Sequence, residues 1–397
     1  MNPRHLEKVL LLQCKLHESL YLFLSADNSN YLTKVFYPFY DVSMNDLVSL
    51  KQLLSEIDPI FFEQSISLLE KNSYKKIPSK EYAKIISTIF GQFYSFPELK
   101  KIKTKRIKLS LNKTESFNKW AVTAEKDSFL SPFFWLKKFV NENLQEFCSG
   151  FFIHGSFADF SFRKGWSDFD SMVLIKKGTV KDEEKLLRLR EKMIKLRCFG
   201  HVFDPLQHHG PHIIVEEEMD FFPQVFFPFV LFEHSVSFFD KPNSLVFLER
   251  AEKTEIKNSL FITKEYFQEI IENRRKIKNA YDWKLFFHNF TLLPVMYLQA
   301  KGIHCYKADS FELIGREFSK GALKPLKIVS GMRENWKLFS PLPKKIESFL
   351  LNSFNPFLLV LFYYFWFWFE PKAIKKIQKK ELLNNCFMLS KKMTEKI

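Results

Sequence analysis

Two aspartates separated by one residue are the part of this sequence best suited to chemistry. Asp168 and Asp170 stand just before an apolar run of strand length at residues 172–175. Because side chains alternate between the two sides of a strand, we expect both carboxylates on one side and Phe169 on the other. Hard divalent cations take oxygen ligands, and two such ions about 3.5 to 4 Å apart serve in-line phosphoryl displacement. These residues therefore predict a metal site.

A glycine and a serine stand a short interval before the aspartates. Gly155 and Ser156 follow a strand expected over residues 151–154. Glycine leaves room for a phosphate to approach the backbone. Ser156 occupies the position where the N-terminus of a helix would offer N–H groups to an anion. This corner predicts a phosphate site facing the metal site.

The order of these residues resembles a known family. A glycine–serine pair after one strand, eleven intervening residues and Asp-x-Asp before the next strand resemble the DNA polymerase beta-like nucleotidyltransferase superfamily. Ser171 departs from the family pattern, which usually has an apolar residue there. The resemblance implies that Asp168 and Asp170 hold two Mg²⁺ ions, or Mn²⁺ in their place, while Gly155 and Ser156 cradle the β- and γ-phosphates. The alternative is that the two aspartates cap a surface strand.

The resemblance also implies a third carboxylate on a strand that follows a helix. A charged helix is expected over residues 179–197, and a short strand over residues 198–204 ends at Asp204. Asp204 is the expected third metal ligand, or the group that takes the proton of the acceptor hydroxyl. Glu216 is the main rival and Asp220 a weaker one. Otherwise Asp204 caps the turn that follows it.

A lysine in the last third of the chain is a candidate phosphate ligand. Residues 293–310 resemble the C-terminal helical domain of small-molecule nucleotidyltransferases, in which one helix ends at glycine and a lysine opens the next. Lys307 matches that lysine, and the resemblance implies that it reaches the triphosphate, with Ser310 as a further contact. The alternative is a surface lysine near a helix start.

A histidine pair lies beside the expected site. His208 and His209 belong to a polar loop at residues 207–210, which either contacts phosphate or acceptor or is an ordinary turn. Zinc is not expected, because no cysteine or further histidine has a suitable ligand spacing.

The elements around these residues predict an α+β fold with a central nucleotidyltransferase-like mixed β-sheet flanked by helices. Apolar residues recur at three- and four-residue steps before residue 125 and after residue 251. We therefore expect an N-terminal helical region (1–125), a nucleotidyltransferase catalytic domain (126–250) and a C-terminal helical domain (251–397). The basic run at residues 100–108 is expected to be a solvated linker or exposed helix face, with contact to RNA or an acidic surface as the alternative.

Composition limits the class of protein. With 46% hydrophobic and 26% charged residues among 397, the chain is expected to be globular, and its net charge of +15 reflects lysines scattered among acids. The charges interleaved near Met1 do not indicate an export peptide. The cysteines are widely spaced, which indicates a reducing compartment, and the expected location is cytoplasmic. They are Cys14, Cys148, Cys198, Cys305 and Cys386.

An aromatic run at residues 357–369 is the most apolar part of the sequence. As a helix, it would reach only about 20 Å, short of the roughly 30 Å of a bilayer interior. The hypotheses are a buried helix, a peripheral membrane contact or a partner surface.

The expected function is a metal-dependent nucleotidyltransferase that moves a nucleoside monophosphate from an NTP, such as ATP, to an acceptor hydroxyl and releases pyrophosphate. A small molecule is the favoured acceptor, with a protein or RNA end left open. The alternative is a catalytically silent protein of the same fold that binds nucleotide or a partner, with a membrane-surface scaffold as a third hypothesis.

Overall fold

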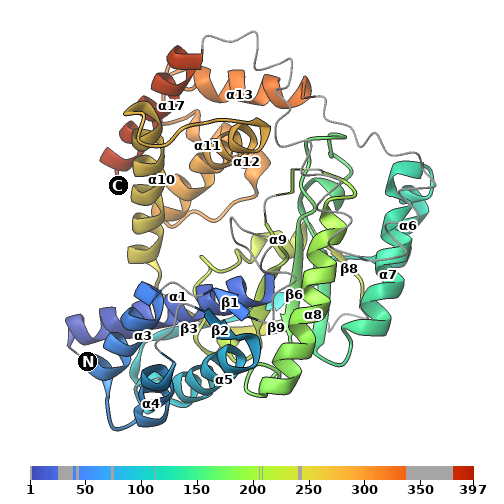
Figure 1. Ribbon diagram of the computed structural model, residues 1–397. Helices are drawn as coiled ribbons and strands as arrows, with labels where there is room; N and C mark the ends of the chain where they lie inside the picture. The colour runs from blue at the N-terminus through green and yellow to red at the C-terminus, as the bar shows by residue number, and fades with distance from the viewer. Residues whose placement is uncertain are drawn as a thin grey trace.

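The structure is a computed structural model with an α+β fold (Figure 1). It describes residues 2–25, 39–41, 44–72, 76–111, 113–204, 206–207, 209–239, 244–336 and 379–397. In Figure 1 the N-terminal helices lie at the lower left, the C-terminal helices at the upper left, and the mixed sheet to the right of both. The aromatic run at residues 357–369 lies outside the described residues.

The N-terminal region is mainly helical, as its apolar spacing predicts. In the first helix, Val9, Leu12, Leu16 and Leu20 are all buried along one face. The elements of this region are α1 (Pro3–Ser25), β1 (Phe39–Asp41), α3 (Met44–Ile57), α4 (Glu63–Lys71), β2 (Lys76–Pro78), α5 (Ser79–Ser95) and the 3-10 helix η1 (Pro97–Lys101). Strands β1 and β2 pair with each other in antiparallel fashion.

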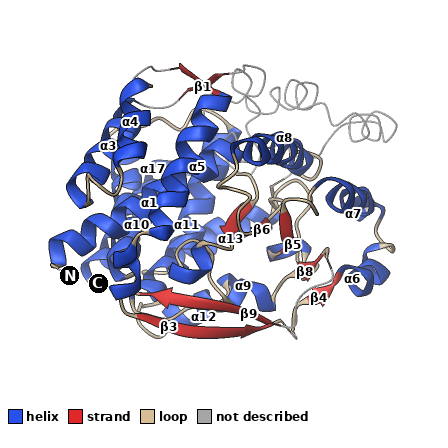
Figure 2. Ribbon diagram, turned by 90° about the horizontal axis from the view of Figure 1, so that it is seen from below, coloured by secondary structure: helices blue, strands red, loops and turns tan. Residues whose placement is uncertain are grey.

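The basic run at residues 100–108 corrects one expectation, because most of it is a strand. β3 (Thr104–Ser110) pairs along its whole length with β9 (Ser244–Arg250) in an antiparallel ribbon (Figure 2). The lysines of β3 are exposed, while every residue of the strand has a partner more than a hundred positions away. The helix-face interpretation was therefore wrong. It rested on the charges of the run itself, which do not indicate a strand partner so far along the chain.

Five strands form the central sheet in the order β4-β8-β5-β6-β7. Their bounds are β4 (Glu115–Ser116), β5 (Cys148–Ile153), β6 (Ser171–Ile175), β7 (His212–Val215) and β8 (Val236–Ser237). β5 is antiparallel to both of its neighbours, whereas β6 and β7 run parallel, as do β4 and β8. The sheet is therefore mixed, as expected.

Side chains alternate between two cores across this sheet. Ile153, Val173 and Val215 belong to the core shared with the N-terminal helices. Phe152, Met172, Leu174 and Ile214 point the other way, against phenylalanines of residues 222–247. The core on the first face continues across residue 125 without a break.

Helices cover the sheet and carry the chain between strands. α8 (Glu183–Gly200) packs against α1 and α5, and its Arg190 and Arg197 donate hydrogen bonds to the carbonyls of Phe23 and Ser25 at the end of α1. The remaining elements near the sheet are α6 (Phe117–Ala124), η2 (Ser128–Leu130), α7 (Pro132–Asn143), η3 (Gly155–Phe157), η4 (Glu218–Phe221) and α9 (Val230–Glu233).

The C-terminal helices have a core of their own. It contains Phe286, Phe290 and Leu293 of one helix and Leu389 of another, and it reaches Trp166 of the central region. The helices are α10 (Lys253–Ile271), α11 (Ala280–Ala300), α12 (Lys307–Ile314), α13 (Lys324–Glu334) and α17 (Lys379–Glu395). None of the helices in the described ranges is long and apolar enough to cross a bilayer.

Candidate functional site

The glycine–serine corner touches the second aspartate. After β5, the N–H of His154 donates to the carbonyl of Asp170 over 3.0 Å, and the chain turns into η3. Gly155 has a φ of +65°, and a Cβ added to it would lie 2.6 Å from Oδ2 of Asp170. A side chain at this position would be strained and would also collide with the carboxylate. The turn therefore requires glycine, and Ser156 follows it as the second residue of η3.

The aspartates lie immediately before β6 and not on it, because the strand begins at Ser171. Phe169 is buried between Phe133 and Phe199 in the aromatic part of the core. This anchoring holds the segment in place and directs Asp168 and Asp170 away from the core.

Asp204 comes to Asp168, although not from a strand. The residues expected to form a strand at 198–204 continue α8 and then turn, with the N–H groups of Phe203 and Asp204 donating to the carbonyl of Gly200. The strand prediction was wrong because the helical pattern persists to Gly200. The Asp204 side chain is fully buried, and its Oδ1 accepts a hydrogen bond from the Leu206 N–H over 3.0 Å.

The two rival carboxylates lie at the opposite end of the sheet. Glu216 follows the last residue of β7 and accepts hydrogen bonds of 2.6 Å from the Ser149 hydroxyl and the Lys177 N–H. Asp220 forms an exposed ion pair with Lys177 at 3.8 Å. The acids precede the start of β6, whereas these groups lie beyond its end, so the structure does not bring them together.

A buried lysine joins Asp168 to Asp204. Nζ of Lys284, on α11, lies 2.7 Å from Oδ1 of Asp168 and also forms an ion pair with Oδ2 of Asp204. One turn later, Nδ1 of His288 lies 3.6 Å from Oδ2 of Asp168. Both residues were missed by the sequence analysis. The available signal was a lysine within the otherwise apolar stretch of residues 283–287.

Four histidines form a row beside the acids. Nε2 of His209 lies 3.2 Å from Oδ1 of Asp170. The ring centre of His209 is 5.7 Å from that of His212 and 6.2 Å from that of His288, and His154 and His212 are 5.6 Å apart. The loop at residues 207–210 therefore contributes His209 to the site, while His208 lies outside the described residues.

Burial and pairing shift the pKa values of these groups strongly. Burial, together with the charge of Asp168, raises the pKa of Asp204 to about 8 even though Lys284 opposes the change. Burial also acts against charge on Asp170 and His209. Their mutual hydrogen bond outweighs it, so the pKa of Asp170 is lowered and that of His209 is raised to about 9.

Burial likewise disfavours the charged form of Lys284, but Asp168 and Asp204 raise its pKa above the ordinary lysine value. In the interior histidines His154 and His212, burial lowers the pKa to about 4 and about 3 respectively. The acid cluster therefore contains fixed positive charges, whereas the inner histidines are neutral at pH 7.

Lys307 is the first residue of α12, as the sequence predicts, and the charges of Asp168 and Asp170 affect its pKa. Burial and the charge of Arg333 lower the pKa of Lys307 to about 8, against the fields of Asp170 and Asp168. The Ser310 hydroxyl donates to the Lys307 carbonyl over 2.7 Å and is buried within its own helix. Ser310 therefore supports the first turn of α12 in this structure.

Arg333 is a further cation that the sequence analysis missed. Its guanidinium lies 5.5 Å from the ring centre of Trp166, and its Nε has no hydrogen-bond partner among the described residues. Burial lowers its pKa, while Asp168 and Asp170 act in the opposite direction. Lys307 and Arg333 thus place positive charge near the acids from two different helices.

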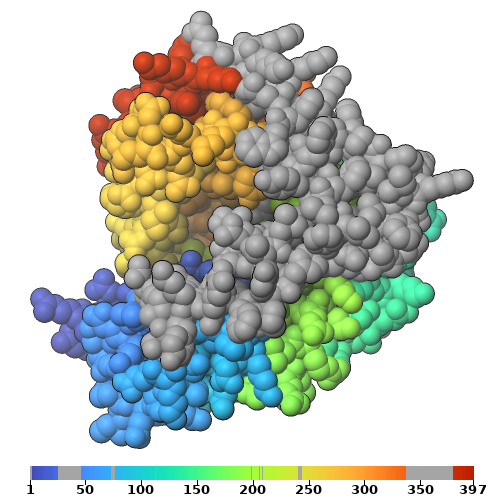
Figure 3. All heavy atoms as spheres, in the orientation of Figure 1, coloured from blue at the N-terminus to red at the C-terminus, as the bar shows by residue number. Residues whose placement is uncertain are grey.

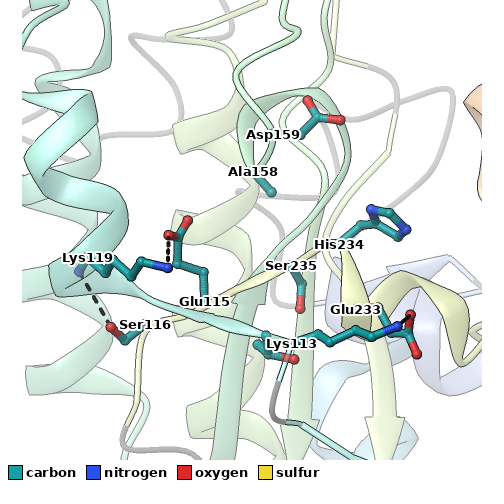
Figure 4. A pocket seen from close by; sticks show the side chains of 10 residues that line it. Lys113, Glu115, Ser116, Lys119, Ala158, Asp159, Glu233, His234 and Ser235 are labelled. Carbon is teal, nitrogen blue, oxygen red and sulfur yellow. Dashed lines mark hydrogen bonds and ion pairs between the residues drawn. The ribbon is translucent and has the colours of Figure 1, made fainter.

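A pocket of about 580 Å³ lies beside the corner (Figure 4). Ala158 and Asp159, which follow η3, form part of its wall, and the acids do not line it. Oδ2 of Asp159 accepts a hydrogen bond of 3.0 Å from Tyr306, whose ring stacks on His234 at 4.1 Å. The other lining residues are Lys113, Thr114, Glu115, Ser116, Lys119, Glu233 and Ser235.

The donor set at the acids suits one hard cation better than two. Asp168 and Asp170 present carboxylate oxygens next to the corner, whereas Lys284 already lies against both Asp168 and Asp204. Within the described ranges, no group of three or more His, Cys, Asp or Glu side chains has an arrangement ready to hold a metal ion.

Comparisons with protein-family models, curated proteins and solved structures found no match to this chain.

Proposed function

We propose that this chain is a metal-dependent nucleotidyltransferase, which moves a nucleoside monophosphate from an NTP to an acceptor hydroxyl and releases pyrophosphate. The observation that carries the proposal is the contact between the Gly155 corner and Asp170. A phosphate held by the corner would lie next to a carboxylate-bound cation, which is the arrangement that phosphoryl transfer needs. The mixed sheet, with the corner after one strand and the acids before the next, supports the nucleotidyltransferase-like assignment.

The chain's own cations would bind the rest of the triphosphate. Gly155 and Ser156 would contact the β- and γ-phosphates through the backbone, and Lys307 would neutralise their charge. Arg333 adds a planar donor whose Nε makes no other hydrogen bond to the described residues. The guanidinium lies over the ring of Trp166, and the charges of Asp168 and Asp170 act to raise its pKa.

Asp168 and Asp170 would hold Mg²⁺ or Mn²⁺. When bound, the ion would neutralise the triphosphate and polarise the phosphoryl group under attack. Asp204 is the third carboxylate of the site, and it acts on Asp168 through Lys284. Catalysis would then come mainly from positioning and electrostatic stabilisation.

The pocket beside Asp159 would receive a polar small-molecule acceptor. Its rim carries the ion pairs Lys113–Glu233, at 2.8 Å, and Lys119–Glu115, at 3.4 Å. Such a surface suits a hydroxylated ligand with charged groups, since each half of an ion pair can turn to a ligand group of opposite charge. We also propose a cytoplasmic location, because the widely spaced cysteines are typical of a reducing compartment.

One observation favours a second candidate, a catalytically silent protein that binds nucleotide or a partner. Lys284 pairs with two of the three carboxylates and His209 with the third. Because Lys284 and His209 already compensate the charge of these acids, the cluster would remain stable in a protein that binds no metal ion and catalyses nothing.

Transfer from labelled NTPs separates the two candidates. The protein would be incubated with each α-labelled NTP, Mg²⁺ or Mn²⁺ and a small-molecule fraction of a cell extract. Transfer of the label to an acceptor and release of the unlabelled pyrophosphate would both be measured. We expect one NTP to support release, and the double variant D168N/D170N to abolish it while its circular dichroism stays unchanged. Release at the parental rate by that folded variant would reject the assignment, whereas NTP binding without any release would favour the silent protein.

A further inference from the structure

The position of Lys284 bears directly on how many metal ions this site can take. Its ammonium group lies between carboxylates from two separate segments, Asp168 before β6 and Asp204 after α8. All three side chains are buried, with exposed fractions of 1% for Lys284, 8% for Asp168 and 0% for Asp204. A buried pair of carboxylates needs a compensating positive charge, and a lysine or a metal ion can supply it.

The lysine is held in place by the packing of its helix. Phe286, Phe287 and Phe290 of the same helix are packed into the C-terminal core, and all three are fully buried or nearly so. The Lys284 ammonium also lies 5.7 Å from the ring centre of Trp166. Because its helix is anchored in the core, Lys284 stays next to both acids. If its side chain moved away, the ammonium group would lose two buried ion pairs.

Asp170, the remaining carboxylate, does not pair with the lysine. Asp170 has no contact with Lys284 and is paired with His209 at 3.2 Å, and its other oxygen, Oδ2, faces Gly155. Its side chain is 26% exposed, more than that of Asp168 or Asp204. An incoming cation therefore reaches Asp170 more easily than the gap between Asp168 and Asp204. On Asp168 it would meet Oδ2, beside Nδ1 of His288 at 3.6 Å, since Lys284 lies against Oδ1.

We infer that Lys284 is a built-in cation that takes the place of one of two metal ions, so that the site binds a single divalent ion on the side of Asp168 and Asp170. This inference rests on the proposed function and deepens it, because it changes the expected metal requirement from two ions to one. Lys284 is then a positioning residue, which orients Asp168 toward the single ion and holds Asp204 beside it.

Counting bound Mn²⁺ tests the inference without any turnover. The intact chain would be titrated with Mn²⁺ alone, and free ion would be measured by electron paramagnetic resonance. We expect about one site in the parental protein and about two in K284A, since removal of the ammonium opens the gap between two carboxylates. The double variant K284A/D204N also lacks the Asp204 carboxylate, so the number of bound Mn²⁺ ions should return to about one.

Matched variants keep the test decisive. K301A removes a lysine at the C-terminal end of the same helix, where it pairs with Glu317, and should leave the count at one. K284M retains the bulk of the side chain without the charge, and it replaces K284A if the latter fails to fold. Both variants would first be compared with the parent by circular dichroism.

The outcomes separate this inference from the proposed function. A parental count of two, or an unchanged count of one in both folded Lys284 variants, would overturn the role of Lys284 and leave the nucleotidyltransferase proposal standing. No Mn²⁺ bound by the parental protein would count against the proposed function itself.

Discussion

Nζ of Lys284 lies 2.7 Å from Oδ1 of Asp168, so a helix of the C-terminal part supplies the counter-charge for an acid just before strand β6 of the central sheet. The two residues are 116 positions apart in the sequence. With Asp204 on the other side of the ammonium, three distant segments meet at one buried charge cluster. The stability of the molecule and the state of its candidate site are consequently linked.

Replacement of Lys284 by alanine should destabilise the fold. The change leaves Asp168 and Asp204 buried without their shared cation, and loss of one partner from a buried charge cluster costs about 3 to 5 kcal/mol. Urea unfolding followed by fluorescence would measure the free energy of unfolding. K301A, which removes an exposed ion pair, should change it by less than about 1 kcal/mol. Equal stability of K284A and K301A would contradict the buried cluster.

Replacement of Gly155 by alanine should impair the corner more than a comparable change elsewhere. The backbone at φ +65° costs about 1 to 2 kcal/mol for any residue with a Cβ, and here the new Cβ also meets Asp170 at 2.6 Å. Gly178 is the matched control, because it has a φ of +85° and no atom within 4 Å of an added Cβ. G155A should therefore lose more stability than G178A, and it should also lose nucleotide affinity. Similar losses in the two variants would show that Asp170 does not crowd the corner.

Nucleotide affinity should fall as the pH rises through about 8. Lys307 has its pKa lowered to about 8 by burial and by Arg333, so it is charged below that pH and neutral above it. Loss of one charged hydrogen bond to phosphate is expected to weaken binding about tenfold between pH 7.5 and pH 9.5. Calorimetric titration with a non-hydrolysable NTP would measure the Kd.

Three variants provide controls for the pH effect. K307R, which stays charged, should retain affinity at pH 9.5, whereas K307M should bind weakly at both pH values. K320M removes an exposed lysine beyond α12 and should behave like the parent. A parental Kd independent of pH would mean that Lys307 does not contact the nucleotide.

Acid should destabilise the protein through its buried histidines. Burial lowers the pKa of His154 to about 4, whereas in the unfolded chain it is near 6.5, so protons bind the unfolded state first as the pH falls. Stability from this residue is therefore complete above about pH 6.5 and is lost as the pH falls toward 4, by about 2 kcal/mol between pH 7 and pH 5.

The variant H154F would isolate this contribution. His154 packs edge-on against Phe227 and its Nε2 has no hydrogen-bond partner among the described residues, so a phenylalanine ring suits the position. Thermal unfolding at pH 7 and pH 5 should show a smaller difference for H154F than for the parent. The same pH difference in both proteins would rule out His154 as an acid-sensitive group.

The local part of the site could be predicted from sequence, because its residues follow one another along the chain. Gly155, Asp168 and Asp170 are brought together by one antiparallel strand pair and the turn between them. Asp204 was placed beside the acids by the family resemblance, although it lies on a turn and not on a strand.

The remote part of the site could not be predicted in the same way. Lys284 and Arg333 come from helices whose docking depends on the C-terminal core, and no periodicity in the sequence encodes which acids those helices will meet. The pairing of β3 with β9 escaped prediction for the same reason, since the basic residues masked the short apolar alternation of Ile107, Leu109 and Leu111 and the partner strand lies far along the chain.

Arg190 and Arg197 of α8 donate hydrogen bonds to the carbonyls at the last turn of α1. A fragment beginning near residue 125 would lose those carbonyl partners and leave two guanidinium groups facing an uncovered apolar layer. The first helices therefore cover one face of the central sheet, and we expect that trimming them to obtain a smaller protein would yield an insoluble product.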